Sequence, residues 1–338
     1  MRDHASGDTK LKVADGLRRL ARAAPGSDLR QAAEAIFAPD VAYISSHPVN
    51  QMHGLDELID CYLSPMKQAM PDLERRDDIL IGGHWQDADW VSATGYYYGT
   101  LISEWFGLHP TNSWIYVRFG EFYKIVGGRI VDVYVILDWV DVFRQLGINP
   151  LRRALGVEGL CPPPSAQDGL VLHDADPVES EASLKLVEAM IFEGMWAFDG
   201  VNHESMRFHD FWVDDMMWYG PGGIGTTRGI DNFYRYHEGP FNDAWPDFKG
   251  GNHVARFGDG PFTCSTGWPS IKATHTGGNF LGLAPSNKPI TMRVMDWWRR
   301  DGGRLSENWI FIDIPDLLAQ LGRDLFAEAR ALQPPSLG

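Results

Sequence analysis

The sequence contains few cysteines, and their spacing excludes two common uses of this residue. Only Cys61, Cys161 and Cys264 occur among the 338 residues, an odd number at wide separation. This arrangement provides neither a CxxC redox motif nor a thiolate zinc cage. We interpret the three residues as small buried hydrophobic side chains with reduced thiols, which is typical of a cytoplasmic protein.

Long apolar runs and an excess of positive charge are also absent. No window reaches the roughly 18 uninterrupted apolar residues of a membrane span, and the N-terminal segment MRDHASGDTKLK lacks the apolar run of a signal peptide. We therefore expect no membrane association. The formal net charge of −15 argues against nucleic acid as a partner, because binding to duplex phosphate relies on clustered Lys and Arg.

Several catalytic and cofactor signatures are missing as well. The sequence has no GxSxG segment and no dinucleotide fingerprint, and no cysteine stands out as a nucleophile with a matched histidine. His203 and His209 are six positions apart, whereas two histidines that share a metal on a helix are expected at i and i+4. The glycine-rich segment 221–229 lacks the spacing of a phosphate-binding loop. We therefore expect no metal and no organic cofactor, and hydrolase or redox chemistry is disfavoured.

Apolar and aromatic side chains, in contrast, are abundant. The composition is 44% hydrophobic, 12% aromatic and 22% charged, which is typical of a folded globular protein. The length exceeds the usual size of a single hydrophobic core, so two domains are expected. Thirteen Trp, seventeen Phe and eleven Tyr are enough either to fill two cores or to line apolar pockets.

The chain repeats itself with an offset of 175 residues. The segment VILDWVDVFRQLG at 135–147 returns as IFIDIPDLLAQLG at 310–322, which aligns Asp138 with Asp313. The same offset holds upstream, where HGLDELIDCYLSPMKQAMPDL matches RGIDNFYRYHEGPFNDAWPDF. So many matches in order, interrupted only by small insertions, predict a duplicated domain.

A Pro-rich segment separates the two copies. CPPPSAQDG, residues 161–169, shows no hydrophobic periodicity and is typical of a linker. We predict an N-terminal domain at 1–158, a linker at 159–178 and a C-terminal domain at 179–338.

Each copy is predicted to start with helices and to end with strands. In the second copy the pattern predicts helices at 179–198, 202–212 and 229–245, a short strand at 212–220, and later strands at 251–257, 261–282, 289–300 and 304–313. Helices followed by antiparallel strands favour an α+β fold. We expect each copy to be a curved antiparallel sheet wrapped around helices, with a cone-shaped pocket between the sheet and the helices.

The order of motifs in the second copy resembles that of a known family. THTGGNFLG, PSNKPI, RRDGGRLSENW, a lone Asp and QLG follow one another along the chain. This order resembles that of the SnoaL-like polyketide cyclases, which belong to the nuclear transport factor 2-like superfamily. The resemblance implies a cystatin-like cone in both copies. It also implies chemistry without metal or organic cofactor, in which one acidic side chain in an apolar cavity moves protons.

Asp138 and Asp313 are the first candidates for this acid, largely because of the resemblance. Each lies in an otherwise apolar segment, where burial raises the pKa of a carboxyl group toward the operating pH. The alternative is that each caps the helix that follows. For Asp141 and Asp316 capping is the expected role.

Hairpin geometry suggests a second pair of acids. If Gly127-Gly128 and Gly302-Gly303 form two-residue turns, Glu121 faces Tyr134 and Asp296 faces Trp309. Asp138 would then share the face of Glu121, and Trp298 would share the face of Asp296. Asp138 would lie about 13 Å along the strand from Glu121, and Asp313 about 13 Å from Asp296. A bulge at the turn would reverse this register. The alternative role for Glu121 and Asp296 is an ion pair with Arg118, Arg293 or another surface charge.

Other side chains are candidates for the walls of the cavity. His275 is suited to proton transfer or to binding a carbonyl oxygen, because neutral imidazole both donates and accepts hydrogen bonds. It is equally suited to a structural role. The aromatic candidates for substrate binding, each with a core role as the alternative, are Tyr43, Tyr134, Trp218, Tyr236, Trp298 and Trp309.

Three functions remain open on this basis. The first is acid/base catalysis on a hydrophobic, aromatic or polyketide-like molecule, leading to cyclisation, isomerisation, dehydration or lysis. The second is carbon–carbon lyase action on lignin-derived diarylpropane-type aromatics, and the third is a non-catalytic binding or dimerisation module. The copies are expected to pair with each other or within a homodimer. The first copy, which has YYYGTLISEWFG where the second has THTGGNFLG, is the one suspected of having lost activity.

Overall fold

The computed structural model describes residues 6–278 and 280–334. The chain divides into two compact units. Unit 1 comprises Met1–Pro150, Ser165–Asp174 and Asp324–Gly338, and unit 2 comprises Leu151–Pro164 and Ala175–Arg323. Residues 1–5, 335–338 and Asn279 of the THTGGNFLG segment lie outside the described residues.

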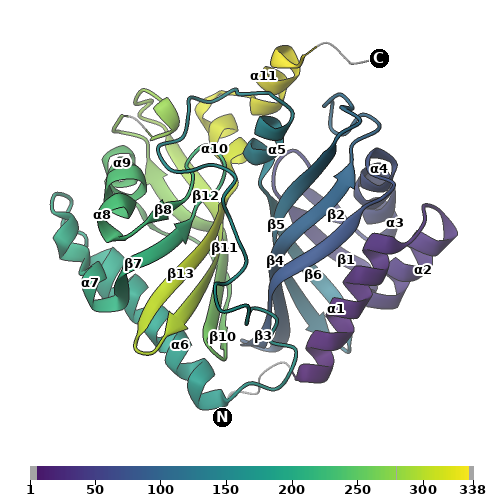
Figure 1. Cartoon of the computed structure of the whole chain (residues 1–338), viewed down its shortest axis with the longest axis horizontal. Helices are drawn as coiled ribbons and strands as arrows, with labels where there is room; N and C mark the ends of the chain where they lie inside the picture. The colour runs from purple at the N-terminus through teal and green to yellow at the C-terminus, as the bar shows by residue number, and fades with distance from the viewer. Residues whose placement is uncertain (1–5, 279, 335–338) are drawn as a thin grey trace. The chain divides into compact units, whose positions relative to one another are not determined.

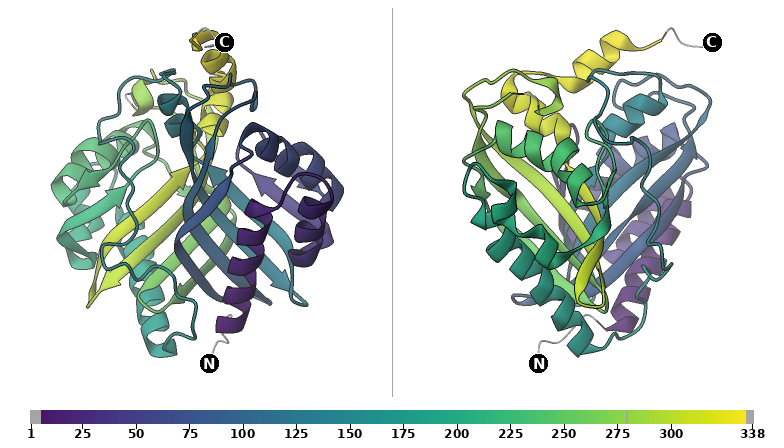
Figure 2. Two further views of the ribbon diagram at one scale, coloured as in Figure 1. Left: turned by 45° about the vertical axis from the view of Figure 1, so that its right-hand side comes forward. Right: turned by 60° about the vertical axis from the view of Figure 1, so that its left-hand side comes forward.

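Unit 1 has an open six-stranded sheet in the order β2-β1-β6-β5-β4-β3. Its strands are β1 (Phe37–Ser45), β2 (Gln51–His53), β3 (Glu74–Trp85), β4 (Ala88–Thr100), β5 (Trp114–Val126) and β6 (Arg129–Leu137). Its helices are α1 (Gly7–Arg22), α2 (Ser27–Ile36), α3 (Leu55–Leu58), the π-helix η1 (Ile59–Leu63), α4 (Ser64–Ala69), α5 (Trp139–Gln145) and the C-terminal α11 (Leu325–Leu332). Figure 2 shows α1 and α2 on one face of this sheet.

Unit 2 repeats this plan with the sheet order β10-β11-β12-β13-β7-β8, and β9 pairs with β11. Its strands are β7 (Trp212–Tyr219), β8 (Thr227–Arg228), β9 (Lys249–Gly250), β10 (His253–Asp259), β11 (Phe262–Thr274), β12 (Pro289–Asp301) and β13 (Arg304–Ile312). Its helices are α6 (Pro177–Ala189), η2 (Met190–Gly194), η3 (Met195–Ala197), η4 (His203–Met206), α7 (Phe208–Phe211), α8 (Ile230–Phe233), η5 (Tyr234–Glu238), α9 (Gly239–Ala244), η6 (Phe280–Gly282) and α10 (Ile314–Leu321). Helices α6 to α9 lie on one face of the sheet (Figure 1).

The predicted α+β fold with two tandem cones is confirmed, with one difference in strand direction. Neighbouring strands of the long meander are antiparallel, but β1 pairs with β6 in parallel, as β7 does with β13. The first strand is separated from the last by helices and several strands, so its direction is not constrained by a hairpin.

The segment predicted to be the linker is divided between the units. In unit 2, the backbone N–H of Gly156 donates to the carbonyl oxygen of Ile224 at 3.0 Å. Residues Ser165–Asp174 belong to unit 1, where the N–H of Leu80 donates to the carbonyl oxygen of Gly169 at 2.9 Å. The helix α11 also belongs to unit 1, and its Phe326 ring packs 5.1 Å from that of Trp139.

The aspartate of the repeated Pro-Asp motif has a structural role in each unit, where it binds the last residue of a long strand. Asp72 accepts hydrogen bonds from the backbone N–H and the hydroxyl of Thr100, both at 2.7 Å. Asp247 does the same with Thr274 at the same distances. These bonds lower the pKa of both carboxyl groups and hold the end of each strand against the preceding turn.

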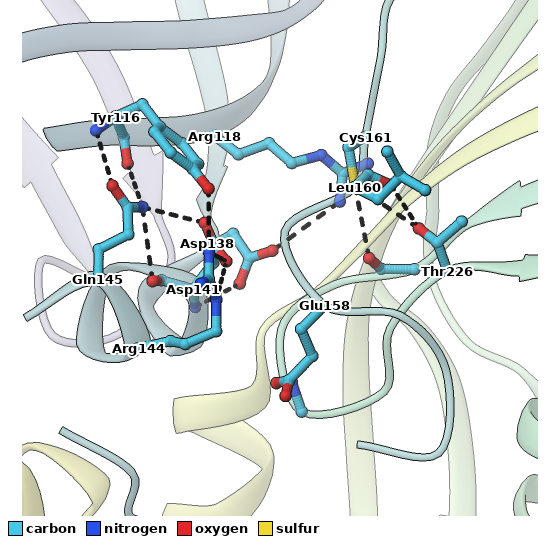
Figure 3. A network of polar contacts seen from close by, with 12 residues as sticks. Tyr116, Arg118, Asp138, Asp141, Arg144, Gln145, Glu158, Leu160, Cys161 and Thr226 are labelled. Atoms are coloured by element: carbon cyan, nitrogen blue, oxygen red, sulfur yellow. Dashed lines mark hydrogen bonds and ion pairs between the residues drawn. The ribbon is translucent and has the colours of Figure 1, made fainter. Parts of the chain in front are cut away.

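The repeated D…QLG motif is also structural. The side chain of Gln145 accepts from the backbone N–H of Tyr116 at 2.9 Å and donates to its carbonyl oxygen at 2.7 Å (Figure 3). In unit 2, Gln320 makes the equivalent pair of bonds with Thr291 at 2.8 and 2.9 Å. The glutamine therefore ties the last helix to the edge of the strand as a further backbone residue would.

Both hairpins contain a one-residue bulge that reverses the predicted register. In β6 the pairing shifts between Ile130 and Asp132, so that Glu121 faces Val135 and Tyr134 faces Phe122. In β13 the shift falls at the equivalent place, and Asp296 faces Ile310. The predicted pairs Glu121–Tyr134 and Asp296–Trp309 are therefore wrong, because the extra residue moves each partner to the opposite face.

Candidate functional site

The helix-covered face of each sheet contains one central acidic residue. Glu121 on β5 and Asp296 on β12 are separated by the 175-residue offset and hold equivalent positions in the strand order. In unit 1 this face is also occupied by Tyr43, which packs 5.2 Å from Tyr62 of η1. In unit 2, the equivalent Trp218 stacks on His237 of η5 at 4.0 Å.

In unit 1 the central acid is fully engaged by its neighbours. Arg75 Nη1 donates to Glu121 Oε2 at 2.5 Å, and the Tyr97 hydroxyl donates to Oε1 at 2.8 Å. The Tyr123 hydroxyl also bonds to Glu121, while Arg75 pairs with Asp77 at 2.7 Å. Because Glu121 is only 2% exposed, this network excludes solvent from the carboxylate.

Two hollows of different size lie beside the helices of unit 1. One of about 260 Å³ lies where α1 and α2 meet the ends of the hairpins, and its lining includes Val13, Ile36 and Ile130. The other, of about 20 Å³, lies between helices and sheet, lined by residues that include Leu17, Leu63, Met66 and Tyr97. This volume is about that of one water molecule. Next to Tyr97, the interior of unit 1 is therefore filled by its own side chains.

In unit 2 the central acid is less constrained. Asp296 Oδ1 accepts one hydrogen bond from Asn308 Nδ2 at 3.2 Å. Burial raises the pKa of Asp296 to about 7, against the lowering effects of Asn308 and Arg256. The residue nevertheless retains solvent-accessible surface. A carboxyl group that is enclosed by protein and still accessible is what we expect for an acid that faces an internal site.

Aromatic and cationic side chains surround Asp296 on the same face. Trp298 is two residues along the strand and pairs with Asn308 of β13, which in turn faces Trp218 of β7. Arg256 of β10 pairs with Ser265 of β11, which faces Asp296. The walls are therefore apolar indole rings on one side and a guanidinium group on the other.

A second buried acid lies on the π-helix η5. Glu238 is 2% exposed, its Oε1 has no hydrogen-bond partner, and burial raises its pKa to about 7. The neighbouring His237 is kept neutral because burial lowers its pKa to about 3. π-helical turns are often found at functional sites. In η1 of unit 1, Leu63 takes the place of Glu238 and Tyr62 takes the place of His237.

Asp138 and Asp313 are helix caps paired with arginine. The Asp138 carboxylate accepts from the N–H of Asp141 at 3.2 Å and lies 3.8 Å from Arg118 (Figure 3). Asp313 accepts from the N–H of Asp316 at 3.2 Å, and Arg293 donates to it at 3.0 Å. This geometry supports the capping alternative for both residues.

The prediction that Asp141 and Asp316 cap the helices is wrong. They occupy the first turn, where Asp141 pairs with Arg144 at 2.8 Å and accepts from Gln145 at 3.0 Å. Asp316 accepts from Gln320 at 2.9 Å. The cap falls one turn earlier because each strand ends one residue before Asp138 or Asp313.

Four of the six predicted aromatic residues lie apart from the sheet face that carries Asp296, and one of them is Tyr43 of unit 1, described above. Trp309 points to the other face of the sheet, where its Nε1 donates to the Pro162 carbonyl oxygen at 2.8 Å. Tyr134 packs against Trp90 at 6.3 Å on the face opposite Glu121. Tyr236 lines a crevice of about 20 Å³ with Arg152 and other residues.

His275 is buried at the end of β11. Its Nδ1 lies 3.1 Å from the Ser286 hydroxyl, and its ring packs 4.6 Å from Trp245. Burial lowers its pKa, and its Nε2 has no hydrogen-bond partner. Its neighbours are therefore those of a packed residue at the strand end, away from the centre of β12 where Asp296 lies.

Sequence reasoning missed Arg256, Asn308 and Glu238. Each replaces an apolar residue at the equivalent position of unit 1, where Leu80, Val133 and Leu63 stand. The signal that could have identified them is a polar residue in one copy that aligns with an apolar residue in the other.

Metal clusters and membrane-spanning helices are both absent from the part of the chain that the structure describes. Residues 6–278 and 280–334 contain no group of three or more His, Cys, Asp or Glu side chains placed to hold a metal ion. No helix in the same ranges has the length and apolarity to cross a membrane.

The two cones, each an open curved sheet with helices on one face, define a nuclear transport factor 2-like protein. A sequence profile described as SnoaL-like polyketide cyclase matches residues 15–146 and again 195–321, which together exceed half of the chain. The chain therefore belongs to the SnoaL-like polyketide cyclase family, and the two separate matches confirm the tandem duplication. No curated protein matches the chain.

Solved structures similar to this chain each correspond to about one unit. A putative SnoaL-like polyketide cyclase from Jannaschia sp. CCS1 is 17% identical, with a TM-score of 0.37, and covers 48% of this chain and 99% of its own. IdmH, a putative polyketide cyclase from Streptomyces antibioticus, is 20% identical, with a TM-score of 0.32 and coverage of 40% and 98%. AclR, a putative hydroxylase from Streptomyces galilaeus, is 20% identical, with a TM-score of 0.31 and coverage of 41% and 97%.

Proposed function

We propose that unit 2 is an acid/base enzyme that acts on a small hydrophobic, aromatic or polyketide-like molecule without a metal or organic cofactor. The observation that carries the proposal is Asp296, whose pKa burial raises to about 7 while the residue keeps some solvent-accessible surface. A group that is half ionised near neutral pH is suited both to accept and to return a proton.

Asp296 would take a proton from a carbon next to a carbonyl or hydroxyl group of the substrate. Asn308 would hold the carboxyl group in place through its hydrogen bond to Oδ1. Trp298 and Trp218 give this face of the sheet an apolar, aromatic character that suits an aromatic substrate. Cyclisation, isomerisation, dehydration and carbon–carbon lysis can all begin with such a proton transfer.

Unit 1 would not carry out this reaction. Its equivalent acid, Glu121, is held by Arg75, Tyr97 and Tyr123, and each contact favours a fixed carboxylate. A catalytic base in that position would have to break an ion pair before it could accept a proton.

The first test is a substrate screen with the wild-type protein beside Asp296→Asn, without added metal or nucleotide. Aromatic ketones, polyketide-like molecules and diarylpropanes would be assayed for turnover. We expect Asp296→Asn to lower kcat by about 10²- to 10⁴-fold, the usual contribution of a general acid/base group. Glu121→Asp, which keeps the negative charge in unit 1, is the matched control and is expected to retain turnover.

Two outcomes would contradict the proposal. Turnover that persists in Asp296→Asn but is lost in Asp313→Asn or Asp138→Asn would transfer the role to the helix caps. Binding of these ligands without turnover at any pH would identify a binding module instead.

The pH dependence offers a second prediction. If Asp296 acts as the base, it must be ionised in the free enzyme, so kcat/KM is expected to rise with pH and to level off above a midpoint near 7. The measurement is kcat/KM between about pH 5 and pH 9 on any substrate from the screen. A profile that is flat through this range would show that another group transfers the proton.

A further inference from the structure

Arg256 is a buried cation on the Asp296 face. It is 8% exposed, and its Nε has no hydrogen-bond partner. The equivalent position in unit 1 is Leu80 of β3. Leu80 pairs with Ala93 of β4, and Ala93 in turn faces Glu121 of β5. The charge is therefore not required by the fold, because the same sheet forms with leucine there.

The contacts of Arg256 are looser than those of a structural buried arginine. Its guanidinium group lies 3.6 Å from Glu188 of α6 and 5.1 Å from the ring of Phe192. In unit 1, Arg75 has carboxylate oxygens at 2.5 and 2.7 Å. A guanidinium group carries five N–H donors, so Arg256 retains donors for a ligand.

Arg256 and Asp296 lie two strands apart on the same face of the sheet. Ser265 separates them in the strand order, so their Cα atoms are about 10 Å apart. Each charge affects the pKa of the other, yet within the described residues no ion pair joins them. An oxygen atom bound to the guanidinium group would bring its neighbouring carbon toward the carboxyl group.

We propose that Arg256 binds the carbonyl oxygen of an enolisable aromatic ketone and stabilises the enolate that forms when Asp296 removes the α-proton. This inference rests on the function proposed above and narrows its substrate class. In the step, the C–H bond breaks, its electron pair forms the C=C bond of the enolate, and the carbonyl electrons move to the oxygen. The proton goes to the Asp296 carboxylate, and it returns when the enolate is protonated or attacks a second carbonyl group.

The test uses 2-naphthol as a stable analogue of the enol, because its oxygen is carried on an aromatic ring and can lose its proton. It would be bound to Asp296→Asn, in which the neutral amide imitates the protonated acid and no turnover occurs. Absorbance distinguishes naphthol from naphtholate. We expect Asp296→Asn to bind naphtholate at least about tenfold more tightly than the double variant Asp296→Asn/Arg256→Met, since a hydrogen bond to a charged group contributes about 1.5–3 kcal/mol.

Two controls address charge and folding. Asp296→Asn/Arg304→Met removes a cation from the exposed hairpin turn and is expected to bind naphtholate as Asp296→Asn does. Asp296→Asn/Arg256→Lys keeps the charge and is expected to recover part of the affinity. If the double variant with Arg256→Met does not fold, the comparison of Asp296→Asn with its Arg256→Lys form still tests the proposal, because lysine cannot reproduce the geometry of the guanidinium donors.

The results separate this inference from the proposed function. Equal naphtholate binding by Asp296→Asn and by its two double variants, Arg256→Lys and Arg256→Met, would overturn the role of Arg256 even if Asp296 proves catalytic. The absence of naphtholate binding by Asp296→Asn would overturn it too. Binding that depends on Arg256, together with a failed substrate screen, would support the oxyanion site and refute only the catalytic proposal.

Discussion

Glu121 and Asp296 hold equivalent positions in the two copies, and their surroundings give them opposite chemistry. The Glu121 carboxylate receives hydrogen bonds from Arg75, Tyr97 and Tyr123, which hold it in a fixed position. Asp296 has Asn308 as its hydrogen-bond donor, and burial favours its neutral form. Under the proposed function, the two copies would therefore differ through the neighbours of the acid and not through the acid itself.

Glu238 provides a prediction for stability. Burial raises its pKa in the folded protein from the ordinary value of 4.5 to about 7. The unfolded chain loses this proton near the ordinary pKa, whereas the folded chain retains it to about pH 7, so the wild-type protein loses stability as the pH rises through this window. Glu238→Gln cannot ionise, and we expect it to be more stable than wild type at pH 8 by about 3 kcal/mol.

Urea unfolding of both proteins at about pH 5 and pH 8 would measure this difference. The two should be nearly equal at the lower pH, where Glu238 is protonated in the folded state. The His237→Gln variant is a useful comparison on the same helix. Because burial lowers the pKa of His237 to about 3, its effect should grow toward acidic pH and be absent at the higher pH.

At the scale of single residues, the sequence predicts which side chains belong to the candidate site better than it predicts their roles. It points to Asp296, Trp298 and Trp218, and the structure brings all three to one face of unit 2. The predicted register had Asp296 facing Trp309, whereas in the structure Trp309 points to the other face of the sheet. The sequence could not predict this, because a single bulged residue after the turn reverses which side chains share a face. Glu238 lies on a predicted helix with no apolar pattern to show that it is buried.

At the scale of elements, the last helix of each copy is the most strongly repeated part. Asp313 caps α10 and Gln320 ties it to β12, and Asp138 and Gln145 do the same for α5 and β5. These bonds require specific side chains at specific positions, so the duplication preserves them. These contacts give the repeated acids a role in folding, and the catalytic role predicted for Asp138 and Asp313 stays a prediction that variants at Asp313 can test.

Substitutions at Asp313 can separate capping from catalysis. Asn keeps a side-chain oxygen for the N–H of Asp316, whereas Ala does not. We expect Asp313→Ala to lower the free energy of unfolding by about 1 kcal/mol or more below that of Asp313→Asn, with turnover unchanged in both once they are folded. Denaturant unfolding and turnover on the same preparations would measure the two effects. A loss of turnover in Asp313→Asn without a loss of stability would restore its catalytic role.

The predicted elements agree with the structure except at one irregular helical segment and at the end of one strand. The strands predicted at 289–300 and 304–313 correspond to β12 and β13, and the helix predicted at 229–245 corresponds to α8, η5 and α9. The helix predicted at 202–212 is instead the short η4 and α7, with Arg207 in a left-handed conformation between them. The strand predicted at 261–282 ends at Thr274, because Asp247 binds the backbone there.

At the scale of the whole molecule, the duplication is the feature that the sequence predicts most fully. The offset of 175 residues recurs in the caps, the bulges and the central acids. The assignment of the connecting segments was less predictable. Leu151–Pro164 and Ser165–Asp174 belong to different units through backbone hydrogen bonds, which leave no periodic pattern in the sequence.

Unit 1 is expected to contribute stability and not turnover. Glu121→Gln would remove one charge of a buried ion pair and leave Arg75 incompletely compensated. Breaking such a pair typically costs about 3 kcal/mol or more. Calorimetry of the full chain should therefore show a lower first unfolding transition, while kcat measured below that temperature should equal that of the wild-type protein. A drop in kcat with unchanged unfolding would assign catalysis to unit 1.

The network that holds Glu121 in unit 1 has a consequence for how this chain tolerates mutation. An enzyme that keeps an acid neutral and accessible gives up folding free energy at its active site, and most proteins have little to spare. Under the proposed function, the two demands would fall on separate copies of the duplicated domain. Random substitutions in the first interior should mainly reduce the amount of folded protein, whereas those in the second should mainly alter which molecules it converts.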